Sequence, residues 1–216
     1  FLHSVMHIRN FDIPVVGVNS GRLGFLADIS ENQINGALSQ IFENKFSVVE
    51  RSMLQVDFRG QENLDFNFAL NEMTVLKTDT SSMINISAFL GDDLLNNYWA
   101  DGLIIATPTG STAYSLSVGG PILTPDSANF VITPLAPHNL TVRPLVVPDN
   151  YEIKLKVEGR GSHFLTSLDF RSVPVELATE ITVKKADFKV KTLQLNDQTF
   201  FSTLRSKLMW GIDRRN

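Results

Sequence analysis

From Phe46 onward the sequence consists largely of short runs of β-branched and aromatic residues separated by turn residues, and this pattern most restricts the possible folds. Each run has the length and the alternating or wholly apolar pattern of a strand. So many strands at short spacing favour a sandwich-like antiparallel domain. The clearest runs are residues 66–77, 84–89, 103–107, 151–157, 173–177 and 188–195.

Helical periodicity is found near both ends of the chain. Apolar residues in the first octet and in 34–42 share one helix face, with Ser30 as the expected N-cap of the second helix. Residues 13–18 between these helices read as a short buried strand, and residues 199–209 return to helical spacing.

These patterns predict an α+β fold in three parts. Residues 1–45 are expected to be a remnant of an N-terminal α/β nucleotide-binding domain, and residues 46–196 an all-β, sandwich-like domain. The C-terminal segment, residues 197–216, is expected to carry a helix that packs back on the first part.

The composition excludes several classes of protein. The 216 residues are 43% hydrophobic, which suits a globular core, and no cysteine is present, which favours a reducing, cytoplasmic location. A net charge of -4 without a long Lys/Arg block disfavours a nucleic-acid partner. The apolar runs are far shorter than the roughly 20 residues that span a membrane, so no membrane partner is expected.

The strongest signal for a ligand lies in residues 101–121. The segment predicts a strand, a Pro/Gly turn and a short helix, with free N–H groups and hydroxyls gathered around the turn. Capping alone would explain a lone Thr-Gly-Ser-Thr, but Asp101, Tyr114 and the Gly119–Gly120 pair add an acid, a stacking ring and room for close backbone approach. We interpret the segment as a site for a polar, phosphorylated ligand. The hydroxyls belong to Thr107, Thr109, Ser111, Thr112, Ser115 and Ser117.

A second candidate is Asn71–Glu72, inside an apolar strand pattern. A carboxylate there is costly unless it faces solvent or finds donors, and it is suited to accept from the two hydroxyls of a ribose. A solvent-facing Glu at a strand end explains the residue equally well.

Other motifs carry less information. No Walker loop or Gly-x-Gly-x-x-Gly fingerprint occurs, and the spacing of the four histidines, including His3 and His7, predicts no metal ligands. Pro134, Pro137 and Pro144 predict a stiff, extended stretch that serves as a pocket wall or a sheet crossover.

As a set, these residues closely resemble the NAD kinase family. The resemblance implies transfer of the γ-phosphoryl group of ATP, or of polyphosphate, to the 2′-hydroxyl of the adenosine ribose of NAD, giving NADP. It also implies a divalent metal such as Mg²⁺ with the ATP, and a homodimer or homotetramer. The motifs are Asn-Ser-Gly-Arg-Leu-Gly-Phe-Leu at 19–26, Asn71–Glu72, Asp-Gly at 101–102 with residues 107–117, Gly-Gly-Pro-Ile at 119–122, Thr-Pro-Leu-Ala-Pro-His at 133–138 and the tail at 204–213.

The same resemblance implies a set of NAD-binding residues. Glu72 would contact ribose hydroxyls, Asp101 would hold the nicotinamide end, Tyr114 would stack, Ser117 would donate near ribose or phosphate, and Ala136 would contact the ligand through its backbone. The central expectation is that Glu72 and the 107–117 bend form one cradle. The full set is His3, Asn71, Glu72, Asp101, Thr112, Ala113, Tyr114, Ser115, Leu116, Ser117 and Ala136.

The sequence departs from the family pattern in two places. The Gly-Gly-Asp-Gly motif, whose aspartate is taken as the general base, is absent, and we expect it immediately before Phe1 in a longer chain. His3 would then follow that aspartate closely and reach a ligand phosphate. Where many relatives have Asp-Gly-Gln, this chain has Asp169–Phe170–Arg171, so no ligand contact is carried over to Arg171.

Two other functions remain as alternatives. One is a dinucleotide-binding or sensing protein that keeps the pocket without the chemistry, and the other is a relative in the lipid kinase branch. Asn71, Glu72 and Tyr114 speak against the lipid kinase, since a lipid head group needs no ribose clamp. The sequence upstream of Phe1 would separate enzyme from binder.

Overall fold

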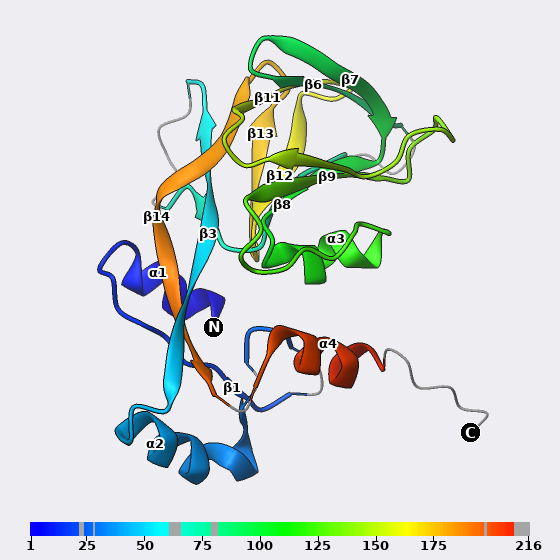
Figure 1. Cartoon of the computed structure of the whole chain (residues 1–216). Helices are drawn as coiled ribbons and strands as arrows, with labels where there is room; N and C mark the ends of the chain where they lie inside the picture. The colour runs from blue at the N-terminus through cyan, green and yellow to red at the C-terminus, as the bar shows by residue number, and fades with distance from the viewer. Residues whose placement is uncertain (22–23, 28, 61–65, 79–81, 197, 210–216) are drawn as a thin grey trace, which may run out of the picture. The chain divides into compact units, whose positions relative to one another are not determined.

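A computed structural model describes residues 1–21, 24–27, 29–60, 66–78, 82–196 and 198–209 (Figure 1). The elements are α1 (Leu2–Ile8), β1 (Val18–Asn19), β2 (Ile29–Ser30), η1 (Glu31–Gln33), α2 (Ile34–Phe42), β3 (Phe46–Phe58), β4 (Phe68–Ala69), β5 (Glu72–Leu76), β6 (Ile84–Leu90), β7 (Asp93–Ala100), β8 (Gly102–Ala106), η2 (Gly110–Thr112), α3 (Tyr114–Ser117), β9 (Asn129–Leu135), β10 (Leu145–Pro148), β11 (Ile153–Glu158), β12 (His163–Leu168), β13 (Arg171–Glu176), β14 (Ile181–Leu195) and α4 (Phe200–Leu208).

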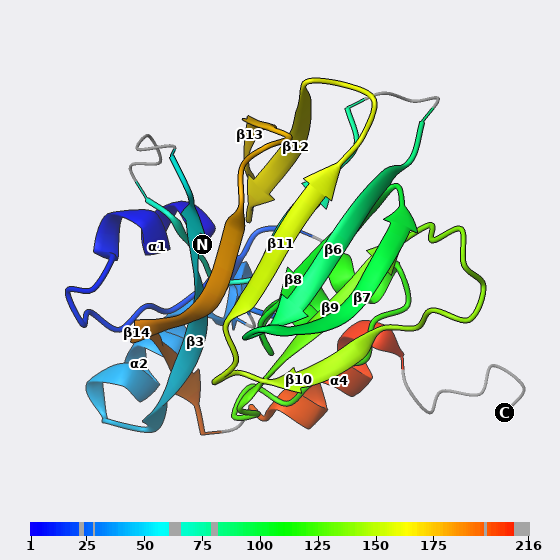
Figure 2. The same cartoon turned by 90° about the horizontal axis from the view of Figure 1, so that it is seen from above.

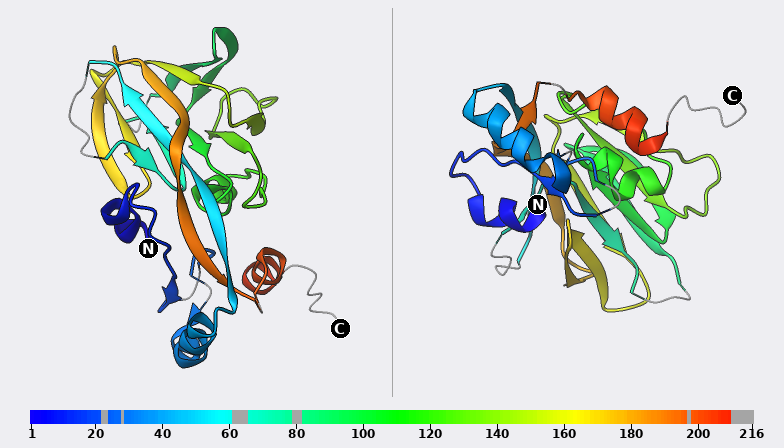
Figure 3. Two further views of the ribbon diagram at one scale, coloured as in Figure 1. Left: turned by 60° about the vertical axis from the view of Figure 1, so that its left-hand side comes forward. Right: turned by 90° about the horizontal axis from the view of Figure 1, so that it is seen from below.

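The chain divides into two compact units, which we describe separately. One contains residues 3–51 and 189–216, and the other contains residues 52–188. The long strands β3 and β14 are neighbours in one sheet, and each contributes residues to both units (Figure 3). Helix α4 belongs to the same unit as α1 and α2, which confirms that the C-terminal helix returns to the N-terminal part.

The unit that holds both termini is built on α2 and a two-stranded parallel sheet, β1–β2. Ala37 of α2 packs with Ile29 and Leu195 in a small buried cluster. The predicted helix over 34–42 is confirmed, but Ser30 precedes the 3₁₀ turn η1 rather than α2 itself. Ser30 is therefore the N-cap of the short 3₁₀ turn that precedes the helix.

The predicted strand over 13–18 is mostly wrong. Val15 forms an isolated bridge to Thr192 of β14, with its N–H donating to the carbonyl of Lys191 at 2.9 Å, and Val18 begins the two-residue strand β1, but residues 13, 14, 16 and 17 lie in no strand. Pro14, the neighbour of Val15, has no N–H to donate, and Ile13 is exposed, so pairing does not extend along the run.

The second unit is a sandwich of two sheets, as predicted. The sheet orders are β10-β9-β8-β5-β12-β13 and β4-β3-β14-β11-β6-β7. Neighbouring strands of the first sheet are antiparallel, as are the β4–β3, β14–β11, β11–β6 and β6–β7 pairs of the second. Figure 2 shows β11, β6 and β7 side by side in one layer. Alternate residues of both sheets bury a shared core that includes Met73, Leu103, Phe130 and Leu155. Strands β3, β7, β9, β10 and β12 lie outside the clearest predicted runs.

One predicted strand, residues 66–77, is two strands in different sheets. β4 pairs with β3 in one sheet, whereas β5 lies between β8 and β12 in the other. Leu70 and Asn71 connect them and carry the chain from sheet to sheet. The change is invisible in the sequence because both strands are apolar and only two residues separate them.

The stretch predicted to be stiff and irregular from Thr133 begins inside β9. Pro134 pairs with Leu103 of β8, and the pairing of β9 with β10 ends at Ile132. The missing N–H of Pro134 therefore removes no bond to β10, which explains how a proline fits into this strand.

The outer face of β8 and β9 is covered by the segment that follows β8. Ile104 and Val131 form a buried cluster against which Val118 and Leu123 pack. This packing fixes η2 and α3 beside the ends of the strands (Figure 1). No helix in the described part of the chain is long and apolar enough to cross a membrane.

Replacing Leu155 with Ala tests the position of the core. Leu155 of β11 is completely buried, and the truncation leaves a cavity, so we expect the free energy of unfolding to fall by about 2–5 kcal/mol. The matched control is Leu94→Ala on β7, where the side chain is 54% exposed and the expected loss is about 0.5 kcal/mol. Urea denaturation measures both, and equal losses would contradict this core.

Candidate functional site

The site forms where the start of β5 meets the end of β8. Glu72 and Ala106 are partners in the antiparallel register, so the Asn71–Glu72 segment lies beside the turn that begins at Thr107. The Thr107 N–H donates to the carbonyl of Asn71 at 2.9 Å, and its hydroxyl donates to the carbonyl of Leu70 at 2.5 Å. The backbones of two distant segments are therefore joined directly.

Gly110 allows this close approach. A Cβ atom at position 110 would lie 2.0 Å from the carbonyl oxygen of Asn71, a distance that no side chain tolerates. The N–H of Gly110 in turn donates to the hydroxyl of Thr107 at 3.1 Å, which closes the turn.

Glu72 presents an unsatisfied carboxylate oxygen at this junction. The residue is only 8% exposed, and its Oε2 atom is buried without a hydrogen-bond partner. The backbone N–H of Tyr114 donates to the carboxylate, so the structure brings Glu72 and the predicted stacking residue together. The Tyr114 side chain itself is 40% exposed. A buried acceptor that lacks a donor is suited to a ligand that supplies one.

Burial and, to a smaller extent, the negative charge of Asp169 raise the pKa of Glu72 to about 7, against the opposing effect of the Tyr114 N–H. Near neutral pH the carboxyl group is therefore part protonated and part ionised. A ligand that donates hydrogen bonds to the ionised form would draw the proton off.

Several hydroxyls of the 107–117 bend are used within the protein. Thr107, Ser111 and Ser115 have buried side chains whose hydroxyls form hydrogen bonds inside the protein, and a contact of these residues with a ligand stays a prediction. Ser111 donates to the carbonyl of Pro108 at 2.6 Å, and Ser115 shares a 2.9 Å hydrogen bond with Thr133 of β9.

The helix dipole, which was expected to favour a phosphorylated ligand at this bend, is also weak. Helix α3 spans only Tyr114–Ser117, a single turn, which aligns few peptide dipoles. The remaining predicted residues of the bend differ in exposure. Thr112, Ala113 and Leu116 are half-buried, and Ser117 is exposed.

Asp101 and Ala136 lie together, but away from Glu72. The N–H of Asp101 donates to the carbonyl of Leu135 at 2.9 Å, next to Ala136. The register of β5 and β8 places Asp101 five residues along from the partner of Glu72, or about 17 Å away. The carboxylate of Asp101 forms a 2.6 Å ion pair with Lys77.

The backbone of Ala136 has an unusual conformation. Its φ of 42° falls in the left-handed region, which costs an alanine roughly 1–2 kcal/mol. Strained backbone of this kind clusters at functional sites. His3 lies exposed on α1 in the other unit, and its contact with a phosphate stays a prediction.

Asp169 of the β12–β13 turn and Arg171, the first residue of β13, join the site although no ligand contact was predicted for them. Asp169 accepts hydrogen bonds from the backbone of residues 70–72, and Arg171 donates to the carbonyls of Phe66 and Phe68. Their sequence signal was weak, because an acid followed by an aromatic residue between two strands is an ordinary turn. Only the fold places that turn beside Glu72.

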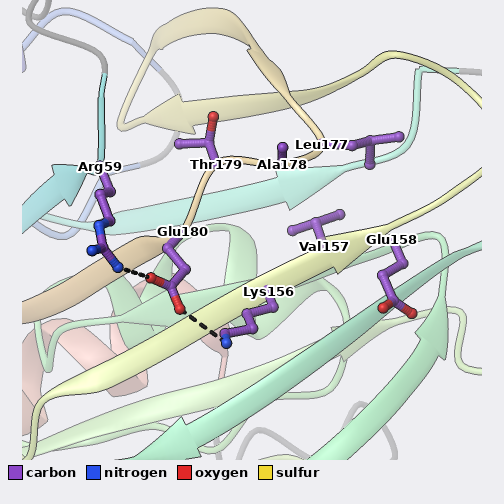
Figure 4. Close-up of a pocket in the computed structure, with 8 residues that line it drawn as sticks. All are labelled: Arg59, Lys156, Val157, Glu158, Leu177, Ala178, Thr179 and Glu180. Carbon is purple, nitrogen blue, oxygen red and sulfur yellow. Dashed lines mark hydrogen bonds and ion pairs between the residues drawn. The ribbon is translucent and has the colours of Figure 1, made fainter.

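A separate surface pocket of about 470 Å³ lies in the same unit (Figure 4). Three of its charged side chains pair with one another, since Glu180 contacts Arg59 at 2.8 Å and Lys156 at 3.0 Å. None of the predicted site residues lines it.

Among the described residues, no three His, Asp or Glu side chains gather as a possible metal site.

The Gly110→Ala variant tests the junction of the two segments. Because the added Cβ would overlap the carbonyl of Asn71, we expect the free energy of unfolding to fall by about 1–3 kcal/mol. The control is Gly36→Ala in α2, where nothing lies within 4 Å and Ala favours the helix by about 0.5–1 kcal/mol. Chemical denaturation gives both values, and a Gly110→Ala protein as stable as the wild type would contradict the close approach.

The Glu72→Gln variant tests the raised pKa. A folded-state pKa above the unfolded value means that wild-type stability is lost as pH rises from about 4.5 to about 7. The amide does not ionise, so the variant should gain up to about 3 kcal/mol relative to the wild type between pH 4.5 and pH 8. Denaturation across this range measures the gain, with the exposed Glu176→Gln as control. A pH-independent difference between Glu72→Gln and the wild type would contradict the shift.

The sequence matches two family profiles along most of its length. Residues 1–46 match the ATP-NAD kinase N-terminal domain, and residues 70–195 match the ATP-NAD kinase C-terminal domain. The NAD kinase of Flavobacterium psychrophilum is 50% identical over 100% of this chain and 74% of that protein. The NAD kinase of Christiangramia forsetii is 51% identical with the same coverage.

Solved structures show the same likeness. A yeast NADH kinase in complex with NADH superposes with a TM-score of 0.88 at 25% identity, covering 98% of this chain and 63% of that chain. An NAD kinase from Archaeoglobus fulgidus in complex with ATP gives a TM-score of 0.77 at 27% identity, covering 91% and 74%. From its profile matches and from its roughly half-identical relatives, the chain belongs to the NAD kinase family.

Proposed function

We propose that this protein transfers the γ-phosphoryl group of ATP to the 2′-hydroxyl of the adenosine ribose of NAD, giving NADP. The observation that carries the proposal is the buried, unpartnered Oε2 of Glu72 beside the Tyr114 backbone, in a chain half identical to NAD kinases. This oxygen is placed to accept hydrogen bonds from sugar hydroxyls.

The proposed dinucleotide contacts fall into two groups. Asn71, Glu72 and the residues of the 112–117 bend would contact one part of the ligand, with Tyr114 stacking on a ring. Asp101 and the strained backbone of Ala136 would bind the nicotinamide end, about 17 Å along the sheet from Glu72. His3 on α1 is proposed to reach a phosphate group.

The chemistry needs positioning and charge neutralisation rather than a covalent intermediate. A ribose hydroxyl also needs a carboxylate to accept its proton. By resemblance to the family, we assign that step to the aspartate of a Gly-Gly-Asp-Gly motif, which residues 1–216 do not contain. The residues of this chain would bind and orient the acceptor sugar.

A divalent ion, Mg²⁺ in our proposal, would accompany ATP. Mg²⁺ is usually held by substrate phosphates with one or two protein carboxylates, and it would neutralise charge on the transferred group. We further propose a cytoplasmic location and a homodimer or homotetramer. The absence of cysteine in the sequence supports the location.

The activity is tested by incubating the protein, expressed from its complete coding region, with NAD, ATP and Mg²⁺. NADP is then measured with an NADP-specific dehydrogenase, and a parallel reaction contains NADH as acceptor. Formation of NADP or NADPH supports the kinase. NAD binding without product would instead favour the non-catalytic dinucleotide-binding protein.

Two substitutions test the binding residues. Glu72→Ala and Asp101→Ala should each weaken NAD binding by more than about 1 kcal/mol, because each removes a charge-assisted acceptor. Since the residues lie about 17 Å apart, the two losses should add in the double variant. Calorimetric titration measures the affinities, with the exposed Glu158→Ala as control. Unchanged affinity in both single variants would remove these residues from the site.

A further inference from the structure

The turn between β12 and β13 forms hydrogen bonds with the backbone of the segment that contains Asn71 and Glu72. Leu168 and Arg171 pair across a two-residue turn formed by Asp169 and Phe170. Because β12 also pairs with β5 up to Met73, this turn lies directly beside Glu72.

Asp169 satisfies three consecutive backbone donors. Its Oδ2 accepts from the N–H of Leu70 at 3.0 Å, and its Oδ1 accepts from the N–H groups of Asn71 at 2.7 Å and Glu72 at 3.3 Å. The Asp169 N–H donates back to the carbonyl of Glu72 at 2.9 Å. One residue therefore contacts the whole 70–72 segment.

Arg171 holds the chain just before that segment. Its guanidinium group donates to the carbonyls of Phe66 and Phe68 and lies 5.1 Å from the centre of the Phe66 ring. Arg171 thus binds carbonyl groups before the crossing between the sheets, and Asp169 binds the N–H groups of the crossing residues and of Glu72.

The conformation of Asp169 indicates why a carboxylate is present here. Its φ is 54°, in the left-handed region where glycine would be free of strain. Burial also raises the pKa of Asp169, although the three N–H bonds and the Arg171 charge oppose the shift. A glycine would make the turn at lower cost, so the carboxylate is explained by the segment that it holds.

We propose that Asp169 is a positioning residue for NAD: by accepting from three successive N–H groups, it fixes Asn71 and Glu72 in the conformation that receives the dinucleotide. The inference rests on the proposed function. Leu70 and Asn71 leave one sheet and enter the other, so their part-buried N–H groups need a partner outside the strands, and Asp169 supplies it. A shift of about 1 Å in such a segment can cost on the order of 10²-fold in function.

A graded series of variants tests the proposal. Asp169→Gly relaxes the turn and removes all three acceptor bonds, whereas Asp169→Asn keeps an oxygen for Asn71 and Glu72 and loses only the bond to Leu70 and the charge. Asn44→Gly is the matched control, because Asn44 has a φ of 56° in the other unit. Each variant, in the complete protein, is titrated with NAD and assayed for the KM of NAD and of ATP.

We expect the Kd and KM for NAD to rise about tenfold or more in Asp169→Gly and by less in Asp169→Asn, with the KM for ATP unchanged. Asn44→Gly should match the wild type. Equal NAD affinity in Asp169→Gly and the wild type, or equal losses for NAD and ATP, would overturn the proposal. If the glycine variant does not fold, wild-type NAD affinity in Asp169→Asn overturns it. A wild-type protein that binds no NAD overturns the proposed function and this inference together.

Discussion

The arrangement of the site depends on how the chain crosses from one sheet of the sandwich to the other at Leu70 and Asn71. A crossing inside a sandwich buries backbone groups that no neighbouring strand can satisfy, and each unpaired group would cost about 1–3 kcal/mol. Here Thr107 donates to the carbonyls of both residues, and Asp169 accepts from both N–H groups. These bonds determine where Glu72 lies.

The same packing explains why Glu72 is chemically unusual. The junction excludes water, so the carboxylate loses its hydration, and the charge of Asp169 lies near it. Only one donor, the Tyr114 N–H, compensates, and Oε2 stays unpartnered among the protein groups. The residue is thus destabilised as an ion until a ligand supplies donors. The crossing between the sheets thus explains both features: it leaves backbone N–H groups that Asp169 must satisfy, and it buries the carboxylate of Glu72 with too few donors.

Much of the fold followed from local patterns, since the continuous apolar run of β8 and the helical periodicity of α2 are each visible within a short window of sequence. The candidate residues Asn71, Glu72 and Tyr114 were also accessible from the sequence, because an acid in an apolar strand and an aromatic residue in a hydroxyl-rich turn are unusual. The strand predicted over residues 13–18 failed for a physical reason, because Pro14 has no N–H and interrupts the pairing. The sequence also did not show that the hydroxyls of Ser111 and Ser115 bond within the protein.

The sequence by itself determined the strand-rich class, the helical segments and the family resemblance, because these depend on residue types within short windows. Only the tertiary structure decided that the 66–77 run divides between two sheets, that Asp101 lies far from Glu72, and that Asp169 binds the 70–72 backbone. These facts depend on register and on contacts between residues up to 99 positions apart, such as Asp169 and Leu70. Local patterns do not encode such pairings, because hydrogen bonds between distant backbone groups leave no periodic trace in the side chains.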